Sequence, residues 1–205
     1  MDNLGRAFNF MFEDPEWLQK ILIGGCFVLL SCILIGLPFL LGYLLLVVKN
    51  SAEGRPLPLP RWDNLGEKFT AGLMYLVVLL LWAVPIWIIC FVLALIPCIG
   101  WIIMIPLAIA AALIMPYIVA RFAVGGKISD AFDFPGIIAF FSQNIVNLLI
   151  VFVMSIVLNF ISYFGILALG VGYLFTSFWA QLGIAYLAGE LYRVGQKGTA
   201  ATAQP

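Results

Sequence analysis

A row of polar side chains follows one predicted helix in the C-terminal third of the chain. The row follows positions 144, 147, 151, 155, 159 and 162, which are three or four residues apart, and only position 151, a valine, is apolar. At 100° per residue these positions share one helix face. This polar seam consists of Asn144, Asn147, Ser155, Asn159 and Ser162, and the next predicted helix adds Ser177 and Gln181 at a spacing of four. Amide and hydroxyl groups exchange hydrogen bonds without carrying charge.

The sequence leaves two uses of the polar seam open. In the first, its amides and hydroxyls hold helices together inside a bundle or against a partner, each bond contributing about 0.6 kcal/mol. In the second, they line a hydrated path for a small neutral solute along the helix 136–162. We take helix packing as the leading interpretation.

Residues for catalysis or metal binding are scarce. The chain has no histidine, and its four cysteines lie in apolar stretches without a Cys-x-x-Cys pair. The acidic residues beyond the N-terminal segment lie at the ends of apolar blocks, where capping and interfacial solvation account for them: Glu53, Asp63, Glu67, Asp130, Asp133 and Glu190. We therefore expect a non-enzymatic protein without a catalytic site, a metal or a cofactor.

The whole composition is that of a membrane protein. Hydrophobic residues make up 64% and charged residues 10% of the chain, against about 25% charged residues in an ordinary soluble domain. A soluble fold could not hide so much apolar surface. The sequence predicts an all-α, polytopic integral membrane protein whose first partner is the lipid bilayer, and a net charge of zero gives no reason to expect nucleic acid.

Three uncharged blocks place the helices. They are residues 21–48, 69–120 and 134–189, and turn residues divide each of them near the middle. We expect about six transmembrane or re-entrant helices in three hairpins, with helices near 69–95 and 101–124, plus interfacial amphipathic helices such as residues 1–13. The first block is short, so it forms either two short helices or one tilted, kinked helix.

A repeat relates the three hairpins. Lys49, Arg121 and Arg193 are 72 residues apart, and each is followed five residues later by glycine. The sequence therefore predicts a single membrane domain, 1–198, built from hairpin units of roughly 1–54, 62–126 and 130–198. The small polar residues 199–205 are predicted to form a disordered tail.

The distribution of basic residues predicts the topology. All ten lysines and arginines lie in the N-terminal segment, in 49–68, in 121–127 or near the C-terminus, and the predicted turns near 96–101 and 163–172 have none. The positive-inside rule then places every charged segment, including both termini, on the cytoplasmic side of the cell membrane.

Three segments carry a family resemblance. They are Asp14–Gly25 (DPEWLQKILIGG), Gly42–Asn50 (GYLL followed by VKN) and Leu59–Asn64 (LPRWDN). They resemble a family of prokaryotic membrane proteins known as domain of unknown function 4013. The resemblance implies a multi-helix bacterial or archaeal membrane protein, and it brings no activity and no catalytic residues.

Three functions remain compatible with these features. The leading expectation is a subunit or scaffold of a membrane complex, whose partners are other membrane subunits or further copies of the chain. The alternative is a small-solute channel or transporter that uses the polar seam. A second alternative is a lipid-binding or membrane-shaping protein, because three interfacial segments precede the hairpins.

Overall fold

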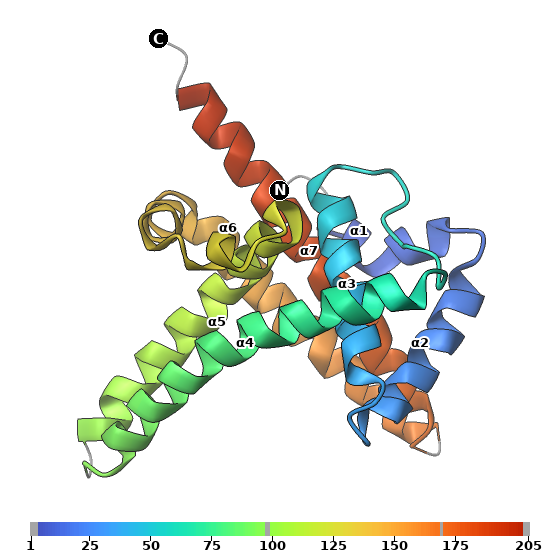
Figure 1. Ribbon diagram of the computed structural model, residues 1–205, viewed down its shortest axis with the longest axis horizontal. Coiled ribbons are helices and arrows are strands. Elements are labelled where there is room, and N and C mark those ends of the chain that lie inside the picture. The colour runs from blue at the N-terminus through green and yellow to red at the C-terminus, as the bar shows by residue number, and fades with distance from the viewer. Residues whose placement is uncertain (1–3, 97–98, 169, 203–205) are drawn as a thin grey trace.

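The computed structural model describes residues 4–96, 99–168 and 170–202, and helices are the only regular structure in these ranges (Figure 1). This confirms the all-α fold class. In chain order the elements are α1 (Arg6–Asn9), η1 (Phe10–Glu13), α2 (Trp17–Ser31), α3 (Leu37–Ala52), α4 (Leu65–Ala94), α5 (Ile99–Gly125), η2 (Ile128–Phe132), α6 (Phe134–Ser162), η3 (Tyr163–Leu167) and α7 (Gly172–Thr202), where η marks a 3-10 helix.

Three helices are long and apolar enough to cross a bilayer. They are Leu65–Ala94, Gly100–Gly125 and Phe134–Leu167, while α2 and α3 are shorter apolar helices. The first uncharged block forms two helices, so the single kinked helix that we allowed for it is wrong. The turn between them contains Leu34 with a left-handed φ of 63°, and Pro38 in the first turn of α3 fits a helix start because its missing N–H has no partner there.

Helix α7 is the centre of the fold. It packs against α1, α2, α3, α5, α6 and η3, and its buried side chains include Phe178, Leu182 and Leu191. In Figure 1 the C-terminal end of α7 and the α3–α4 connector lie towards the top, and the turns inside the three hairpins lie towards the bottom. This arrangement separates the charged connectors from the uncharged turns.

Glycines set the closest helix crossings. A Cβ atom on Gly42 of α3 would overlap the carbonyl oxygen of Lys68, and one on Gly72 of α4 would overlap that of Pro38. A Cβ atom on Gly189 of α7 would likewise overlap the carbonyl oxygen of Val48 in α3. Small residues allow two helix backbones to approach closely, so these positions fix how α4 and α7 cross α3.

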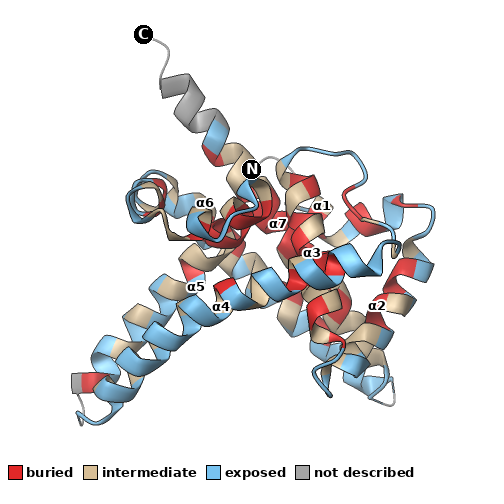
Figure 2. Ribbon diagram, viewed as in Figure 1, coloured by how far each residue is buried: buried red, intermediate tan, exposed pale blue. Residues whose placement is uncertain are grey.

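The α4–α5 hairpin projects from the rest of the molecule as an arm. Its distal half runs to the lower left of Figure 1 and is coloured mostly as exposed in Figure 2. Large apolar side chains near its tip, such as Trp87 (67% exposed) and Ile102 (71%), contact little of the protein. In a bilayer such side chains face lipid or a partner helix.

Two features differ from the sequence-based expectations. Helix α6 is bent at Asn144, whose φ of −124° and ψ of 24° are not helical, so the polar seam does not follow one straight face. Helix α7 extends to Thr202, past residue 199 where the predicted tail begins, and residues 203–205 lie outside the described ranges. The disordered tail stays a prediction.

Candidate functional site

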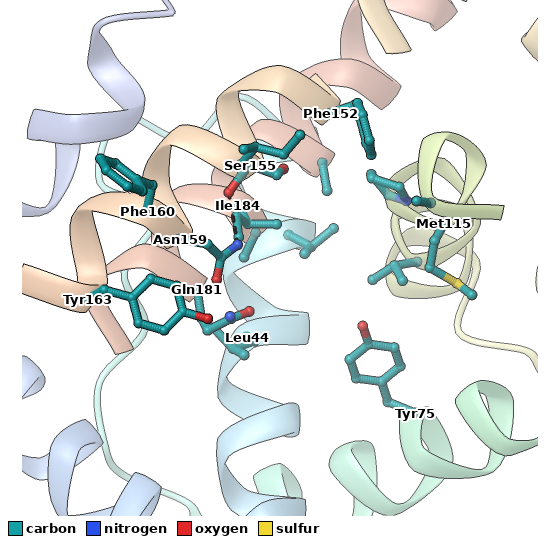
Figure 3. A pocket seen from close by; sticks show the side chains of 17 residues that line it. Leu44, Tyr75, Met115, Phe152, Ser155, Asn159, Phe160, Tyr163, Gln181 and Ile184 are labelled. Atoms are coloured by element: carbon teal, nitrogen blue, oxygen red, sulfur yellow. Dashed lines mark hydrogen bonds between the residues drawn. The ribbon is translucent and has the colours of Figure 1, made fainter. Parts of the chain in front are cut away.

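A cavity of about 550 Å³ lies where α3, α4, α5, α6 and α7 meet (Figure 3). Its volume falls in the range of roughly 300–1,000 Å³ that is usual for small-molecule sites. Its wall is mostly aliphatic and aromatic. The polar lining residues are Tyr75 from α4, Ser155 and Asn159 from α6, Tyr163 from η3 and Gln181 from α7.

The mouth of the cavity lies between α5 and α6. The exposed lining residues are Ala112 on α5, Ile156 and Phe160 on α6, and Tyr163 at the start of η3. The opposite wall is closed by buried residues, including Val48 of α3 and Ala188 of α7. The exposed rim is uncharged and lies on two of the helices that are long and apolar enough to cross a bilayer.

Hydrogen bonds orient the polar groups on the α6 wall. Ser155 Oγ donates to the carbonyl oxygen of Val151 at 2.7 Å, and Asn159 Nδ2 donates to that of Ser155 at 2.8 Å. Each donor is therefore satisfied by the preceding turn of its own helix. Within the described part of the chain, Oδ1 of Asn159 accepts no hydrogen bond and the side-chain amide of Gln181 makes none, although both line the cavity.

The structure divides the predicted seam into two groups. Ser155, Asn159 and Gln181 meet at the cavity, whereas the other members do not line it. Their bonds run from Asn144 Nδ2 to the Phe140 oxygen (3.3 Å), from Asn147 Nδ2 to Asn144 Oδ1 (3.4 Å), from Ser162 Oγ to the Asn159 oxygen (2.7 Å) and from Ser177 Oγ to the Leu174 oxygen (3.1 Å). All of these bonds stay within one helix.

Sequence reasoning missed three residues of this region. Thr176 joins α7 to α6 through a 2.7 Å hydrogen bond from its Oγ1 to the carbonyl oxygen of Ser162. Tyr75 and Tyr163 bring hydroxyl groups to the cavity from outside the seam (Figure 3). Tyr163 directly follows Ser162, so a search of the predicted turn could have found it, but no local pattern links Tyr75 to the seam.

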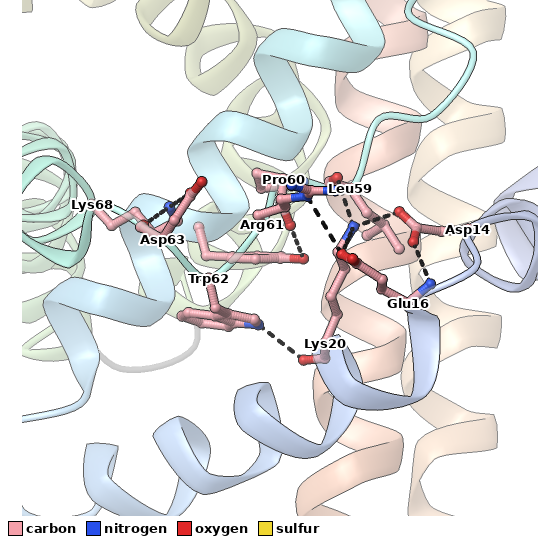
Figure 4. Close-up of polar contacts among 10 residues, drawn as sticks. Asp14, Glu16, Lys20, Leu59, Pro60, Arg61, Trp62, Asp63 and Lys68 are labelled. Atoms are coloured by element: carbon pink, nitrogen blue, oxygen red, sulfur yellow. Dashed lines mark hydrogen bonds and ion pairs between the residues drawn. The ribbon is translucent and has the colours of Figure 1, made fainter.

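Charged side chains pair with one another away from the cavity. Lys20 Nζ lies 2.6 Å from Asp14 Oδ2, with both side chains only 7% exposed (Figure 4). Asp14 Oδ1 also accepts from the backbone N–H of Glu16 at 2.8 Å. Trp62 of the α3–α4 connector donates to the Lys20 carbonyl oxygen at 3.0 Å and stacks on Tyr43 with ring centroids 4.1 Å apart. These contacts fasten the connector to α2 and α3.

A second ion pair fixes the start of α6. Asp133 Oδ1 accepts from the backbone N–H of Gly136 at 3.2 Å, and Asp133 Oδ2 lies 2.8 Å from Arg121 Nη1. The Gly136 hydrogen bond first, and then Arg121, hold the pKa of Asp133 below its usual value. Asp133 is therefore a helix cap. Within the described ranges, no group of three or more His, Cys, Asp or Glu side chains comes together as metal ligands would.

Three helices that are long and apolar enough to cross a bilayer, in a chain whose described part has helices as its only regular structure, mark an all-helical integral membrane protein. Within that class, the chain belongs to the family described as proteins of unknown function DUF4013, whose model matches residues 25–171. The match confirms the resemblance found in the sequence. No curated protein and no solved structure matches the chain.

Proposed function

We propose that this protein is a non-enzymatic membrane protein that binds a lipid-like molecule in the cavity where α3, α4, α5, α6 and α7 meet. The observation that carries the proposal is the mouth between α5 and α6, because Ala112, Ile156 and Phe160 leave an uncharged opening at the side of the bundle. A molecule dissolved in the bilayer could enter there without crossing water. This ranks the lipid-binding alternative above the other two functions.

The solute-path alternative has less support from the same geometry. A hydrated path needs polar groups along its length, but the seam bends at Asn144 and only Ser155, Asn159 and Gln181 reach the cavity. The aliphatic and aromatic walls around them favour an apolar occupant over a column of water.

Two alanines on α5 offer a matched test of the proposal. Ala112 lines the cavity mouth, whereas Ala110 is exposed and does not line the cavity. Ala112→Trp should obstruct the mouth, and Ala110→Trp adds the same bulk to a surface that faces lipid. Each protein would be purified in detergent, and its retained lipid quantified by mass spectrometry. The proposal predicts loss of retained lipid in Ala112→Trp alone; equal retention in both variants would refute it.

A role as a subunit of a complex is the second candidate, and the α4–α5 arm favours it. The distal half of the arm projects from the other helices and exposes Trp87, Leu95, Trp101 and Ile102 (Figure 2). A second copy of the chain or another membrane subunit would cover this surface. The mass of the protein in nanodiscs tests the homo-oligomer: a dimer that becomes a monomer on Trp87→Ala and Trp101→Ala supports it, and a monomeric wild type contradicts it.

The proposed topology places both termini and the two charged connecting segments, 49–68 and 121–127, on the cytoplasmic side of the cell membrane. Its support is the separation of charged connectors from uncharged turns in Figure 1 together with the distribution of basic residues. In a cysteine-free background, Leu57→Cys should label from the cytoplasmic side and Leu167→Cys from the outside, because both side chains are exposed. Labelling of Leu57→Cys from the outside would contradict the arrangement.

A further inference from the structure

We infer that the ligand of the cavity is an uncharged amphiphile, with a hydroxyl or ester head group and at least one long hydrocarbon chain. This inference rests on the proposed function and adds the chemical class of the ligand. The observation behind it is a small set of neutral hydrogen-bonding atoms in an otherwise apolar wall that have no hydrogen-bond partner among the described residues.

The charge of the lining sets the first limit on the ligand. None of the described residues that line the cavity is Asp, Glu, Lys or Arg. The buried ion pairs, such as Lys20 with Asp14, lie elsewhere. A phosphate or ammonium group in the cavity would lose its water without gaining a counter-charge, which is strongly unfavourable. The lining therefore discriminates against the charged head groups of common phospholipids.

The free hydrogen-bonding groups set the second limit. Gln181 presents an amide that can both donate and accept, and Asn159 presents its Oδ1 acceptor beside it on the neighbouring helix (Figure 3). The hydroxyl group of Tyr75 projects into the cavity from the opposite side. Among the described residues the only hydrogen bond that these groups make is the one from Asn159 Nδ2 to the backbone carbonyl oxygen of Ser155. A hydroxyl group with a neighbouring carbonyl could satisfy the Asn159 acceptor and the Gln181 donor together.

The remaining wall suits a hydrocarbon chain. Leu44 on α3, Met115 on α5, Phe152 on α6 and Ile184 on α7 surround the space next to the polar groups. The mouth beyond them allows the rest of a long chain to stay in the bilayer. A diacylglycerol has the required uncharged head, ester carbonyls and chains, and it serves as the probe for this class.

The test compares two photoactivatable lipids with identical acyl chains in nanodiscs that contain the intact protein. One probe is a diacylglycerol, and the other is the corresponding phosphatidylglycerol. The inference predicts cross-links to the cavity segments of α6 and α7 that are on the order of tenfold more abundant with diacylglycerol. Gln181→Leu should lower the diacylglycerol signal by a similar factor, because a ligand group then stays unpaired.

Tyr75→Phe removes a single oxygen atom from the cavity and serves as a second variant if Gln181→Leu folds poorly. It should lower diacylglycerol labelling by less than Gln181→Leu does. Three outcomes are decisive. Selective, Gln181-dependent labelling supports the inference. Equal labelling of the cavity by both probes overturns the ligand class and leaves the proposed function standing. Cavity labelling by neither probe overturns both.

Discussion

Asn159 on α6 and Gln181 on α7 face one cavity. Asn159 Nδ2 donates to the carbonyl oxygen of Ser155, and Oδ1 of Asn159 has no hydrogen-bond partner among the residues that the structure describes. The polar seam read from the sequence therefore has a different use over its C-terminal half than over its N-terminal half. At the bend in α6, the side chain of Asn144 donates a hydrogen bond to the backbone carbonyl oxygen of Phe140. Near Asn159 the seam provides hydrogen-bonding groups to a cavity.

The two halves of the seam should respond differently to the same substitution. Asn159→Leu removes an acceptor from the cavity, so retention of lipid by the purified protein should fall. Asn147→Leu, on the same helix but outside the cavity, should leave retention unchanged. Each variant loses one hydrogen bond within α6, so the free energies of unfolding of the two variants should differ by less than about 1 kcal/mol. Equal loss of lipid in both variants would assign the effect to the helix rather than to the cavity.

The buried pair of Lys20 and Asp14 should be important for stability. Asp14→Asn leaves the Lys20 charge in a site where the side chain is only 7% exposed, and the expected loss is about 3–5 kcal/mol. Glu16→Gln is the matched control, because Glu16 is 46% exposed and 3.9 Å from Lys20, and its loss should stay below about 1 kcal/mol. Thermal unfolding in one detergent measures both. Similar melting temperatures for the two variants would show that the buried pair of Lys20 and Asp14 is not needed for the stability of the fold.

The α3–α4 crossing should tolerate no side chain at Gly72. Gly72→Ala places a methyl group against the carbonyl oxygen of Pro38, so it should destabilise the protein by about 1–3 kcal/mol. Gly66→Ala adds the same atom to the same helix where nothing lies within 4 Å, and it should be neutral or slightly stabilising. Thermal unfolding distinguishes them, and destabilisation of the same size at both glycines would contradict the close crossing.

Acid should weaken the start of α6. The pKa of Asp133 is held below its ordinary value of 3.8 by the N–H of Gly136 and by Arg121. Such a carboxylate stabilises the folded protein fully above its unfolded-state pKa, and the contribution is lost as the pH falls through the lower folded-state pKa. Melting temperatures of the wild type and Asp133→Asn should therefore differ at neutral pH and converge as the pH falls below 3.8. A constant difference across this range would exclude the linkage.

The positions of the helices could be predicted from the sequence because nearby residues determine where each helix begins and ends. Charged residues and Gly or Pro turns bound each apolar block, so helices predicted near 69–95 and 101–124 are found at Leu65–Ala94 and Ile99–Gly125. The bend at Asn144 was not predicted, although an Asn side chain can bond to the backbone and compete with helix formation. The three-hairpin repeat and the six crossings remain predictions.

The cavity could not be predicted because it depends on how the hairpins cross. Ser155, Asn159 and Gln181 were found from their spacing, but Tyr75 reaches them only because Gly42 and Gly72 let α4 cross α3 closely. The same spacing also included Asn144 and Asn147, which do not line the cavity. Helical periodicity identifies a polar face, and only the packing of the neighbouring helices shows which part of that face meets a ligand.

Methyl NMR spectroscopy of the protein in nanodiscs tests the central claim most directly. Met115 and Ile184 line the cavity, and Ile102 is 71% exposed near the tip of the arm. Addition of diacylglycerol to the nanodiscs should shift the methyl resonances of Met115 and Ile184 in a saturable manner and leave that of Ile102 unchanged. Equal, non-saturating shifts at all three methyl groups, or no shift at Met115 and Ile184, would contradict binding in the cavity.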